Sequence, residues 1–169
     1  MIRKATYDDL ESIERLFLSV TSSESMTSFC GWEKGIYPTR QTAISALERG
    51  DLFAYFYENE ALGCAVINQI QAKEYKSINW EIVARDREII SIHTLCVAPK
   101  ATGQGIARAM LSFANSYGKS LGAIAIRLDT SKSNLPAQSL YKSFGFEERG
   151  ETHLGNSSRL YLCLEAPIK

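Results

Sequence analysis

A glycine-rich turn between an apolar run and a helical stripe constrains this chain more than any other feature. The turn, residues 102–107, follows the apolar run 89–97 and precedes a helical pattern over 106–117. The order predicts a strand, a turn and a helix. The first N–H groups of a helix have no intrahelical partner, and the helix dipole favours negative charge at that end. Because glycine lets the backbone approach an anion closely, the turn predicts a phosphate or pyrophosphate site.

Length and charge limit the classes of protein to consider. The 169 residues suggest one domain over residues 1–169, large enough to bury a substantial core. Lysine and arginine number 19, and aspartate and glutamate also number 19. A net charge of zero argues against a protein that mainly coats nucleic acid or an anionic membrane. We therefore expect neither nucleic acid nor membrane as a partner.

The cysteines and the N-terminus point to a reducing compartment. The four cysteines are scattered, none forms a C-x-x-C pair, and the chain has only two histidines. This pattern predicts no metal site and no disulfide framework. The N-terminus turns polar at once, and no apolar run approaches the length of a membrane span. We expect a cytoplasmic protein.

Apolar periodicity and turn residues predict an order of βααβββαβαββ. The predicted strands cover residues 2–5, 52–57, 61–68, 88–97, 123–129, 146–152 and 159–164, with a hairpin turn at residues 58–60 between the second and third. Helices are expected after a Thr6 cap, over 39–49, over 106–117, and after an Asn134 cap. Residues 21–28 are expected to be loop, and residues 72–87 loop with about one helical turn. The order implies an α/β fold with a mixed sheet and helices on both faces.

Two motifs carry a resemblance to a known family. After Val97-Ala98-Pro99, residues 102–107 resemble an Arg/Gln-x-x-Gly-x-Gly/Ala loop, with Thr102 in place of the usual Arg or Gln. Residues 134–146 closely resemble Asn-x-x-Ala-x-x-Leu-Tyr-x-x-x-Gly-Phe. Together they make the chain similar to the GNAT superfamily, the acetyl-CoA-dependent N-acetyltransferases. The segments 92–97 and 127–130 further resemble a bacterial group whose acceptors are poorly defined.

The resemblance implies a GNAT fold, whose central mixed sheet is mostly antiparallel, and acetyl-CoA as donor with no metal. Backbone N–H groups of the turn would hold the pyrophosphate, so Thr102 costs at most one side-chain contact. The strand before the turn would bind the pantetheine arm and polarise the thioester carbonyl through a backbone N–H. The residues expected to contact the donor are Leu95, Cys96, Val97, Thr102, Gly103, Gln104, Gly105, Ile106, Ala107, Arg108, Asn134, Ala137 and Tyr141.

Tyr141 and His93 are the candidate catalytic residues. In the family the tyrosine at the position of Tyr141 lies beside the CoA sulfur, where a protonated phenol would donate to the departing thiolate. His93 shares a strand face with Leu95 and Val97. A histidine titrates near neutral pH and would accept the proton of the incoming amine, directly or through water. The alternatives are a core tyrosine and a half-buried structural histidine, with Glu81 and Glu88 as weaker candidate bases.

Three aromatic residues are candidates for the acceptor pocket. Trp32, Tyr37 and Trp80 lie in the segments expected to cover it, where they would line the pocket or stack on a cationic amine. Their alternative role is packing. The carboxylates expected to attract an amine are Glu24, Glu33 and Glu81.

The function implied is acetyl transfer to a primary amine by direct attack in a ternary complex. The acceptor, a small molecule or a peptide, stays open, as does a homodimer. The alternatives are an acyl-CoA-binding sensor without turnover and an acyltransferase that uses a longer acyl-CoA.

Overall fold

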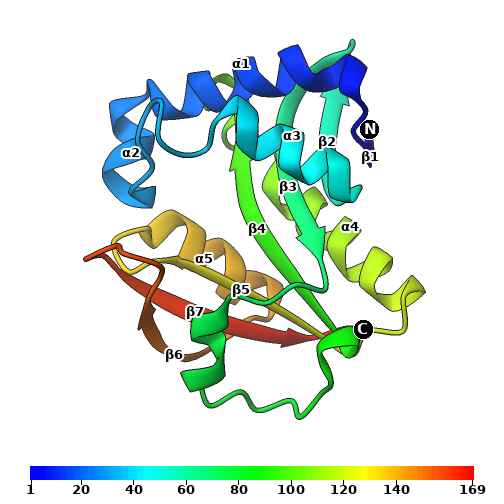
Figure 1. Ribbon diagram of the computed structural model, residues 1–169, viewed down its shortest axis with the longest axis vertical. Helices are drawn as coiled ribbons and strands as arrows, with labels where there is room; N and C mark the ends of the chain where they lie inside the picture. The colour runs from blue at the N-terminus through cyan, green and yellow to red at the C-terminus, as the bar shows by residue number, and fades with distance from the viewer. The chain divides into compact units, whose positions relative to one another are not determined.

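The computed structural model describes residues 1–169, which form two units. The first unit contains residues 1–67 and 93–113, and the second contains residues 68–92 and 114–169. Strand β4 (Ile89–Val97) and helix α4 (Ile106–Ser120) each contribute residues to both units (Figure 1).

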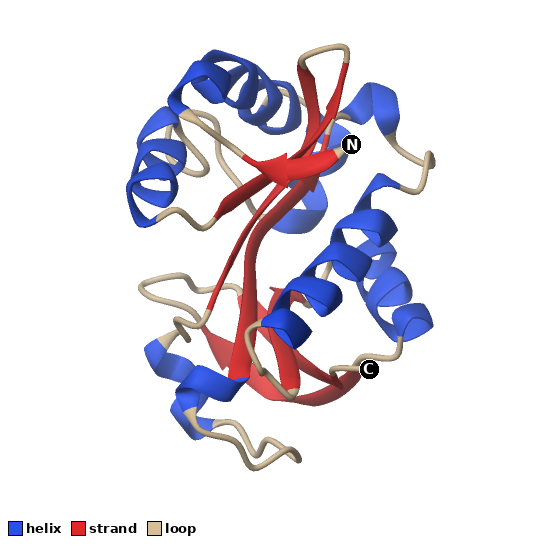
Figure 2. Ribbon diagram, turned by 90° about the vertical axis from the view of Figure 1, so that its right-hand side faces the viewer, coloured by secondary structure: helices blue, strands red, loops and turns tan.

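The first unit is a set of antiparallel strands with helices packed against them. β1 (Ile2–Lys4) pairs with β2 (Leu52–Tyr57), and β2 pairs with β3 (Glu60–Asn68). The end of β4 continues beside β3, where Ala98 donates a backbone hydrogen bond to Leu62 at 2.8 Å. Helices α1 (Leu10–Thr21) and α3 (Arg40–Arg49) pack together, and α2 (Glu24–Cys30) lies between them in sequence. The Phe53 ring contacts Phe113 of α4, so α4 covers the other face of these strands (Figure 2).

The second unit contains both parallel and antiparallel pairs. Residues Ile89–Ile92 of β4 run parallel to β5 (Ala125–Ser131), while β7 (Leu160–Pro167) runs antiparallel to both β5 and β6 (Glu147–His153). Helix α5 (Leu135–Phe144) lies along these strands (Figure 1). The segment before β4 has only two 3-10 turns, η2 (Lys73–Ser77) and η3 (Asp86–Glu88). The core residues of this unit are fully buried aliphatic side chains: Ile89, Ile90, Ile126, Leu128 and Leu164.

Most predicted elements are confirmed. The hairpin turn at Glu58–Asn59 has positive φ at both residues, +45° and +65°, as a type I′ turn requires. The mixed, mostly antiparallel pairing and the loop with short helical turns over 72–87 are also confirmed. The loop predicted over residues 21–28 is wrong, because α2 begins at Glu24 and ends at a left-handed Gly31. No residue of α2 is buried, and its apolar residues, Met26, Phe29 and Cys30, span little more than one turn, which is too short a stripe to reveal the helix.

A buried ion pair fastens the irregular segment of the second unit to its strands. Arg127 of β5 lies 2.9 Å from Glu165 of β7, and their side chains are 7% and 1% exposed. Arg127 also donates to the Gln71 side chain at 2.8 Å and to the Ile82 carbonyl at 3.0 Å. The Glu165 carboxylate accepts the backbone N–H groups of Glu81 and Ile82, each at 3.0 Å. Charged side chains are rarely buried unless paired, and here each charge is hydrogen-bonded as well.

The first helical segment is fixed by a charged cap. Asp9 accepts the Thr6 backbone N–H at 2.8 Å and two hydrogen bonds from Arg3, at 2.7 and 2.8 Å. The hydrogen bond from Arg3, followed by the smaller contribution of Thr6, outweighs burial and lowers the pKa of Asp9 from 3.8 to about 2. A folded-state pKa below the unfolded value means that the stabilisation is complete above about pH 4 and is lost as the pH falls toward 2.

Replacing Asp9 with asparagine is therefore expected to lower the free energy of unfolding by about 1–2 kcal/mol at pH 7. The deficit relative to the native protein should shrink as the pH falls below 4. Urea denaturation at pH 7 and pH 3 measures both effects. Asp8→Asn, an exposed neighbour in the same turn, is the control and should change little. A deficit that stays constant over this pH range would contradict the explanation.

Candidate functional site

The end of β4 departs from regular strand geometry where the oxyanion contact is predicted. The pairing of β4 with β5 ends at Ile92. Two residues later, Thr94 has a φ of +53°. A β-branched residue in this left-handed region costs about 1–3 kcal/mol and persists only where surrounding contacts impose it. From His93 to Val97 burial alternates, with His93, Leu95 and Val97 half-buried and the two residues between them buried.

One of the contacts that hold Thr94 comes from Tyr37. The Tyr37 and Thr94 hydroxyls form a hydrogen bond. Tyr37 lies in the connection between α2 and α3, where its backbone pairs with Glu33. Trp32 contacts the Tyr37 ring edge-on, with centroids 5.8 Å apart. Within the first unit, two of the three predicted acceptor aromatics are therefore connected to the residue next to His93.

Trp80, the third aromatic, lies in the second unit and is held by packing. Its ring stacks on the Arg127 guanidinium at 4.3 Å and contacts the Tyr75 ring at 5.1 Å. Its indole N–H donates to the Tyr75 carbonyl at 2.9 Å. The same cluster contains the buried residues Ile78 and Cys163. These contacts match the packing alternative for Trp80, and its role toward an acceptor stays a prediction.

The turn before α4 is exposed, and two of its backbone N–H groups are already used, since Thr102 donates to Pro99 O at 3.2 Å and Gln104 to Ala101 O at 3.3 Å. Gly103 and Gly105 have φ of +82° and +79°. Residues 102–105 are exposed, and α4 begins at Ile106, with Gly105 O accepting from Ala109 N at 2.9 Å. The N–H groups of Ile106 and Ala107 cannot have partners within the helix. This arrangement fits a pyrophosphate, since the donors are oriented and the helix dipole adds positive charge.

Gly105→Ala is expected to weaken acetyl-CoA binding about tenfold, because a Cβ would stand where the backbone must approach the phosphates. A Cβ added at Gly105 meets no protein atom within 4 Å. The cost to folding is therefore backbone strain alone, about 1–2 kcal/mol. Calorimetric titration with acetyl-CoA measures the affinity.

Gly122→Ala is the matched control, because Gly122 has a φ of +75° and also has open space at its Cβ. It should cost similar stability and leave the affinity unchanged. Equal affinities for the two variants would contradict the assignment of the turn.

Helix α5 carries the second motif. Asn134 accepts a hydrogen bond from the backbone N–H of Ala137 at 3.2 Å and so caps the helix, as predicted. Tyr141 is buried on the same helix and contacts the Phe146 ring, with centroids 5.8 Å apart. Burial, and next the charge of Asp129, raise the pKa of Tyr141 well above its ordinary value of 10. The phenol is therefore fully protonated at neutral pH and is able to donate a proton.

Asp129 is the residue near Tyr141 that sequence reasoning missed. Its carboxylate accepts the Tyr75 hydroxyl hydrogen bond at 2.7 Å. Burial and this carboxylate also raise the pKa of Cys163 to about 12. Tyr75 and Asp129 are 54 positions apart, so no local pattern links them. The one available signal was a carboxylate at the end of a buried strand, which needs a partner.

The predicted residues thus fall into two sets. The first unit contains Trp32, Tyr37, His93, Leu95–Val97 and the turn 102–108. The second contains Trp80, Asn134, Ala137 and Tyr141. No group of histidine, cysteine, aspartate and glutamate side chains is arranged to hold a metal ion. None of the helices combines the length and the apolar composition that crossing a membrane requires.

Comparison with known families gives a match over most of the chain. The sequence model described as the acetyltransferase (GNAT) family matches residues 10–146. An uncharacterised N-acetyltransferase of Methanocaldococcus jannaschii is 27% identical over 151 residues, which are 88% of this chain and 61% of that protein. A streptothricin acetyltransferase of Escherichia coli is 27% identical over 116 residues, 67% of this chain and 58% of that protein. The chain therefore spans about three-fifths of the length of these relatives.

Solved structures share the fold at low sequence identity. A GNAT-family acetyltransferase of Streptococcus agalactiae has a TM-score of 0.83 at 18% identity, covering 100% of this chain and 95% of that one. The ribosomal-protein-S18-alanine N-acetyltransferase of Escherichia coli has a TM-score of 0.71 at 17% identity, covering 100% and 94%. At these identities the likeness shows the fold alone.

Proposed function

Because the chain belongs to the acetyltransferase (GNAT) family, we propose that it transfers the acetyl group of acetyl-CoA to a primary amine. The proposal treats residues 1–169 as a single acetyltransferase domain, since the family match takes in residues of both units. The observation that carries it is the exposed turn at 102–105, which leads into the N–H groups of Ile106 and Ala107, for which the helix itself offers no partner. Such a helix start suits a pyrophosphate, which acetyl-CoA has, and so supports the proposal.

The donor supplies a thioester, whose acyl carbon is open to direct attack by an amine. Backbone N–H groups of the turn would hold the donor, with Arg108 close by on the first turn of α4. A backbone N–H among Leu95, Cys96 and Val97 would stabilise the negative charge that develops on the carbonyl oxygen. The left-handed conformation of Thr94 supports this role, since it turns the following backbone groups out of the regular strand pattern.

Two side chains would move protons. Tyr141 would donate to the departing thiolate, and its raised pKa supports this because the phenol stays protonated. His93, directly or through water, would accept the proton of the amine, while Asn134 and Ala137 would border the donor at the start of α5. Tyr37 and Trp32 would lie on the acceptor side, connected to β4 through Thr94.

A cytoplasmic location is part of the proposal. All four cysteines are free thiols, which suits a reducing compartment.

A thiol-release assay with acetyl-CoA tests the proposal. The acceptors would include diamines, amino acids, streptothricin and a peptide with an N-terminal alanine, the last two suggested by the names of a relative and a structural neighbour. Succinyl-CoA in parallel tests the acyl chain. Release with one class of amine supports the transferase and identifies its acceptor.

Two other outcomes would count against the proposal. Acetyl-CoA binding without release for any amine would favour the alternative, an acyl-CoA sensor. Absence of acetyl-CoA binding in calorimetry would overturn the proposal altogether. Sedimentation of the purified protein separately tests whether it forms a homodimer.

A further inference from the structure

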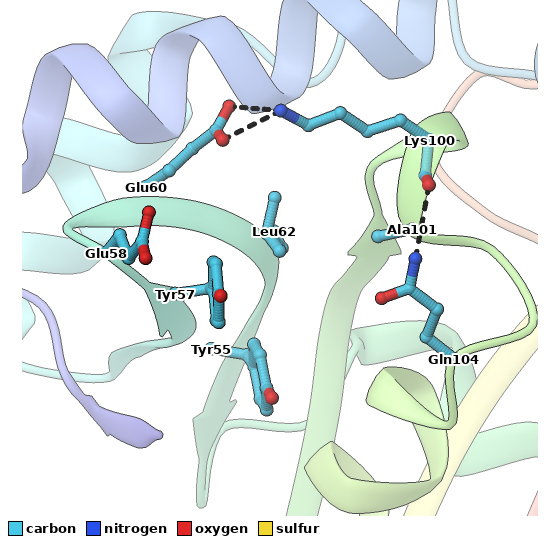
Figure 3. Close-up of a pocket in the computed structure, with 8 residues that line it drawn as sticks. All are labelled: Tyr55, Tyr57, Glu58, Glu60, Leu62, Lys100, Ala101 and Gln104. Atoms are coloured by element: carbon cyan, nitrogen blue, oxygen red, sulfur yellow. Dashed lines mark hydrogen bonds and ion pairs between the residues drawn. The ribbon is translucent and has the colours of Figure 1, made fainter.

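A pocket apart from the candidate catalytic residues lies within the first unit, between the β2–β3 hairpin and the turn that precedes α4. Its volume is about 420 Å³, within the range of pockets that hold small molecules. Eight residues line it (Figure 3). None of them is among the candidate catalytic or acceptor residues, and only Gln104 belongs to the predicted donor turn.

Two tyrosines form the aromatic side of this hairpin pocket. Tyr55 and Tyr57 stand two positions apart on β2 and direct their rings into the same space (Figure 3). Tyr57 is 60% exposed, which leaves much of its ring open to a ligand. Leu62 of β3 adds an apolar contact. Open tyrosine rings favour a flat or cationic ligand over an anion, because the faces of aromatic rings are electronegative.

Of the charged side chains that line the pocket, one carboxylate, that of Glu58, has no cationic partner. Lys100 contacts both carboxylate oxygens of Glu60 at 2.7 Å, and this pair is neutral. Glu58, at the hairpin turn, lies next to Tyr57 and forms no ion pair (Figure 3). Gln104 is occupied by a hydrogen bond to the Lys100 carbonyl at 3.3 Å. The pocket therefore has a net negative charge, and its one cation is already neutralised.

We propose that the hairpin pocket binds a small organic cation with a primary ammonium group. The ammonium would lie over the rings of Tyr55 and Tyr57 and be attracted by Glu58, with the carbon chain against Leu62. A phosphate or carboxylate is disfavoured, since it would face Glu58 with no free cation to balance it. The site is additional to the proposed acetyl transfer and uses none of its reacting groups.

The probe for this site is 1,5-diaminopentane, with pentane-1,5-diol as its uncharged counterpart. Calorimetric titration of the purified protein, without acetyl-CoA, is expected to show binding of the diamine and none of the diol. Glu58→Gln and Tyr57→Leu should each weaken diamine binding about 5- to 10-fold. Both positions are exposed, so neither change should prevent folding. Glu48→Gln, an exposed glutamate of α3, is the matched control and should bind like the native protein.

Three results would overturn the proposal. The first is equal binding of the diamine and the diol. The second is diamine binding that neither Glu58→Gln nor Tyr57→Leu weakens, which would place the diamine elsewhere. The third is displacement of the diamine by acetyl-CoA together with weaker acetyl-CoA binding in Tyr57→Leu, which would assign the pocket to the donor. Because the titration needs no turnover, its failure would leave the proposed transferase untouched.

Discussion

Replacing Tyr141 with phenylalanine is expected to lower turnover about 10²- to 10⁴-fold while acetyl-CoA still binds with native affinity. The hydroxyl is the only group lost. No hydrogen bond of this hydroxyl contributes to the raised pKa of Tyr141, so stability should hardly change. A loss of this size corresponds to about 3–5.5 kcal/mol of transition-state stabilisation. Steady-state kinetics and calorimetric titration measure the two quantities separately.

Tyr161→Phe is the matched control for this prediction. Tyr161 is a half-buried tyrosine on β7 of the same unit, with no assigned role, and its replacement should leave turnover unchanged. Because burial and Asp129 keep the phenol of Tyr141 neutral, activity in the native protein should not fall through ionisation of Tyr141 below pH 10. Native turnover in Tyr141→Phe would show that another group, or water, protonates the thiolate.

The largest expected loss of stability is at Arg127. Arg127→Met removes one partner of the buried pair and leaves the Glu165 carboxylate, 1% exposed, with only the longer contact to Arg149, at 3.7 Å, as an ion pair. Such a change typically costs about 3–5 kcal/mol. For a chain of this length the melting temperature should fall by roughly 6–20 °C. Urea denaturation and thermal melting measure the effect.

Two further variants separate burial from charge. Lys132→Met breaks an ion pair with Glu151 of similar length, 2.6 Å, but with the lysine 57% exposed, and should cost at most about 1 kcal/mol. Replacing Arg127 by methionine and Glu165 by leucine together should recover part of the loss, since no buried charge remains unpaired. If Arg127→Met cost no more than Lys132→Met, the network would not be the anchor of residues 71–82.

The sequence predicted the fold wherever the residues that define an element are close together in the chain. Helix α5 is an example, because the Asn134 cap and the apolar stripe through Tyr141 lie within one segment. The hairpin at Glu58–Asn59 is another, since two strands and a turn follow one another directly. Helix α2 was missed because its apolar residues, Met26, Phe29 and Cys30, span little more than one turn and none of them is buried.

The candidate site was predictable only in its motif residues. The turn at 102–107 and Tyr141 belong to motifs that are continuous in the sequence. Thr94 could not be foreseen in a left-handed conformation, because its β-branched side chain disfavours that region unless tertiary contacts, here with Tyr37, compensate. The Asp129 carboxylate acts on Tyr75 and Tyr141 through space, and no periodicity encodes such a contact.

The position of Glu165 in the sequence affects when residues 81 and 82 are able to fold during synthesis, because its carboxylate accepts their backbone N–H groups. Glu165 is 84 and 83 positions away from these two residues. At about 5–20 residues per second, a ribosome needs roughly 4–17 s to reach it. During that interval residues 71–82 have been synthesised without the acceptor for two of their amides. The segment therefore takes its native form only after β7 has been added, and until then this part of the nascent chain stays exposed to proteases and chaperones.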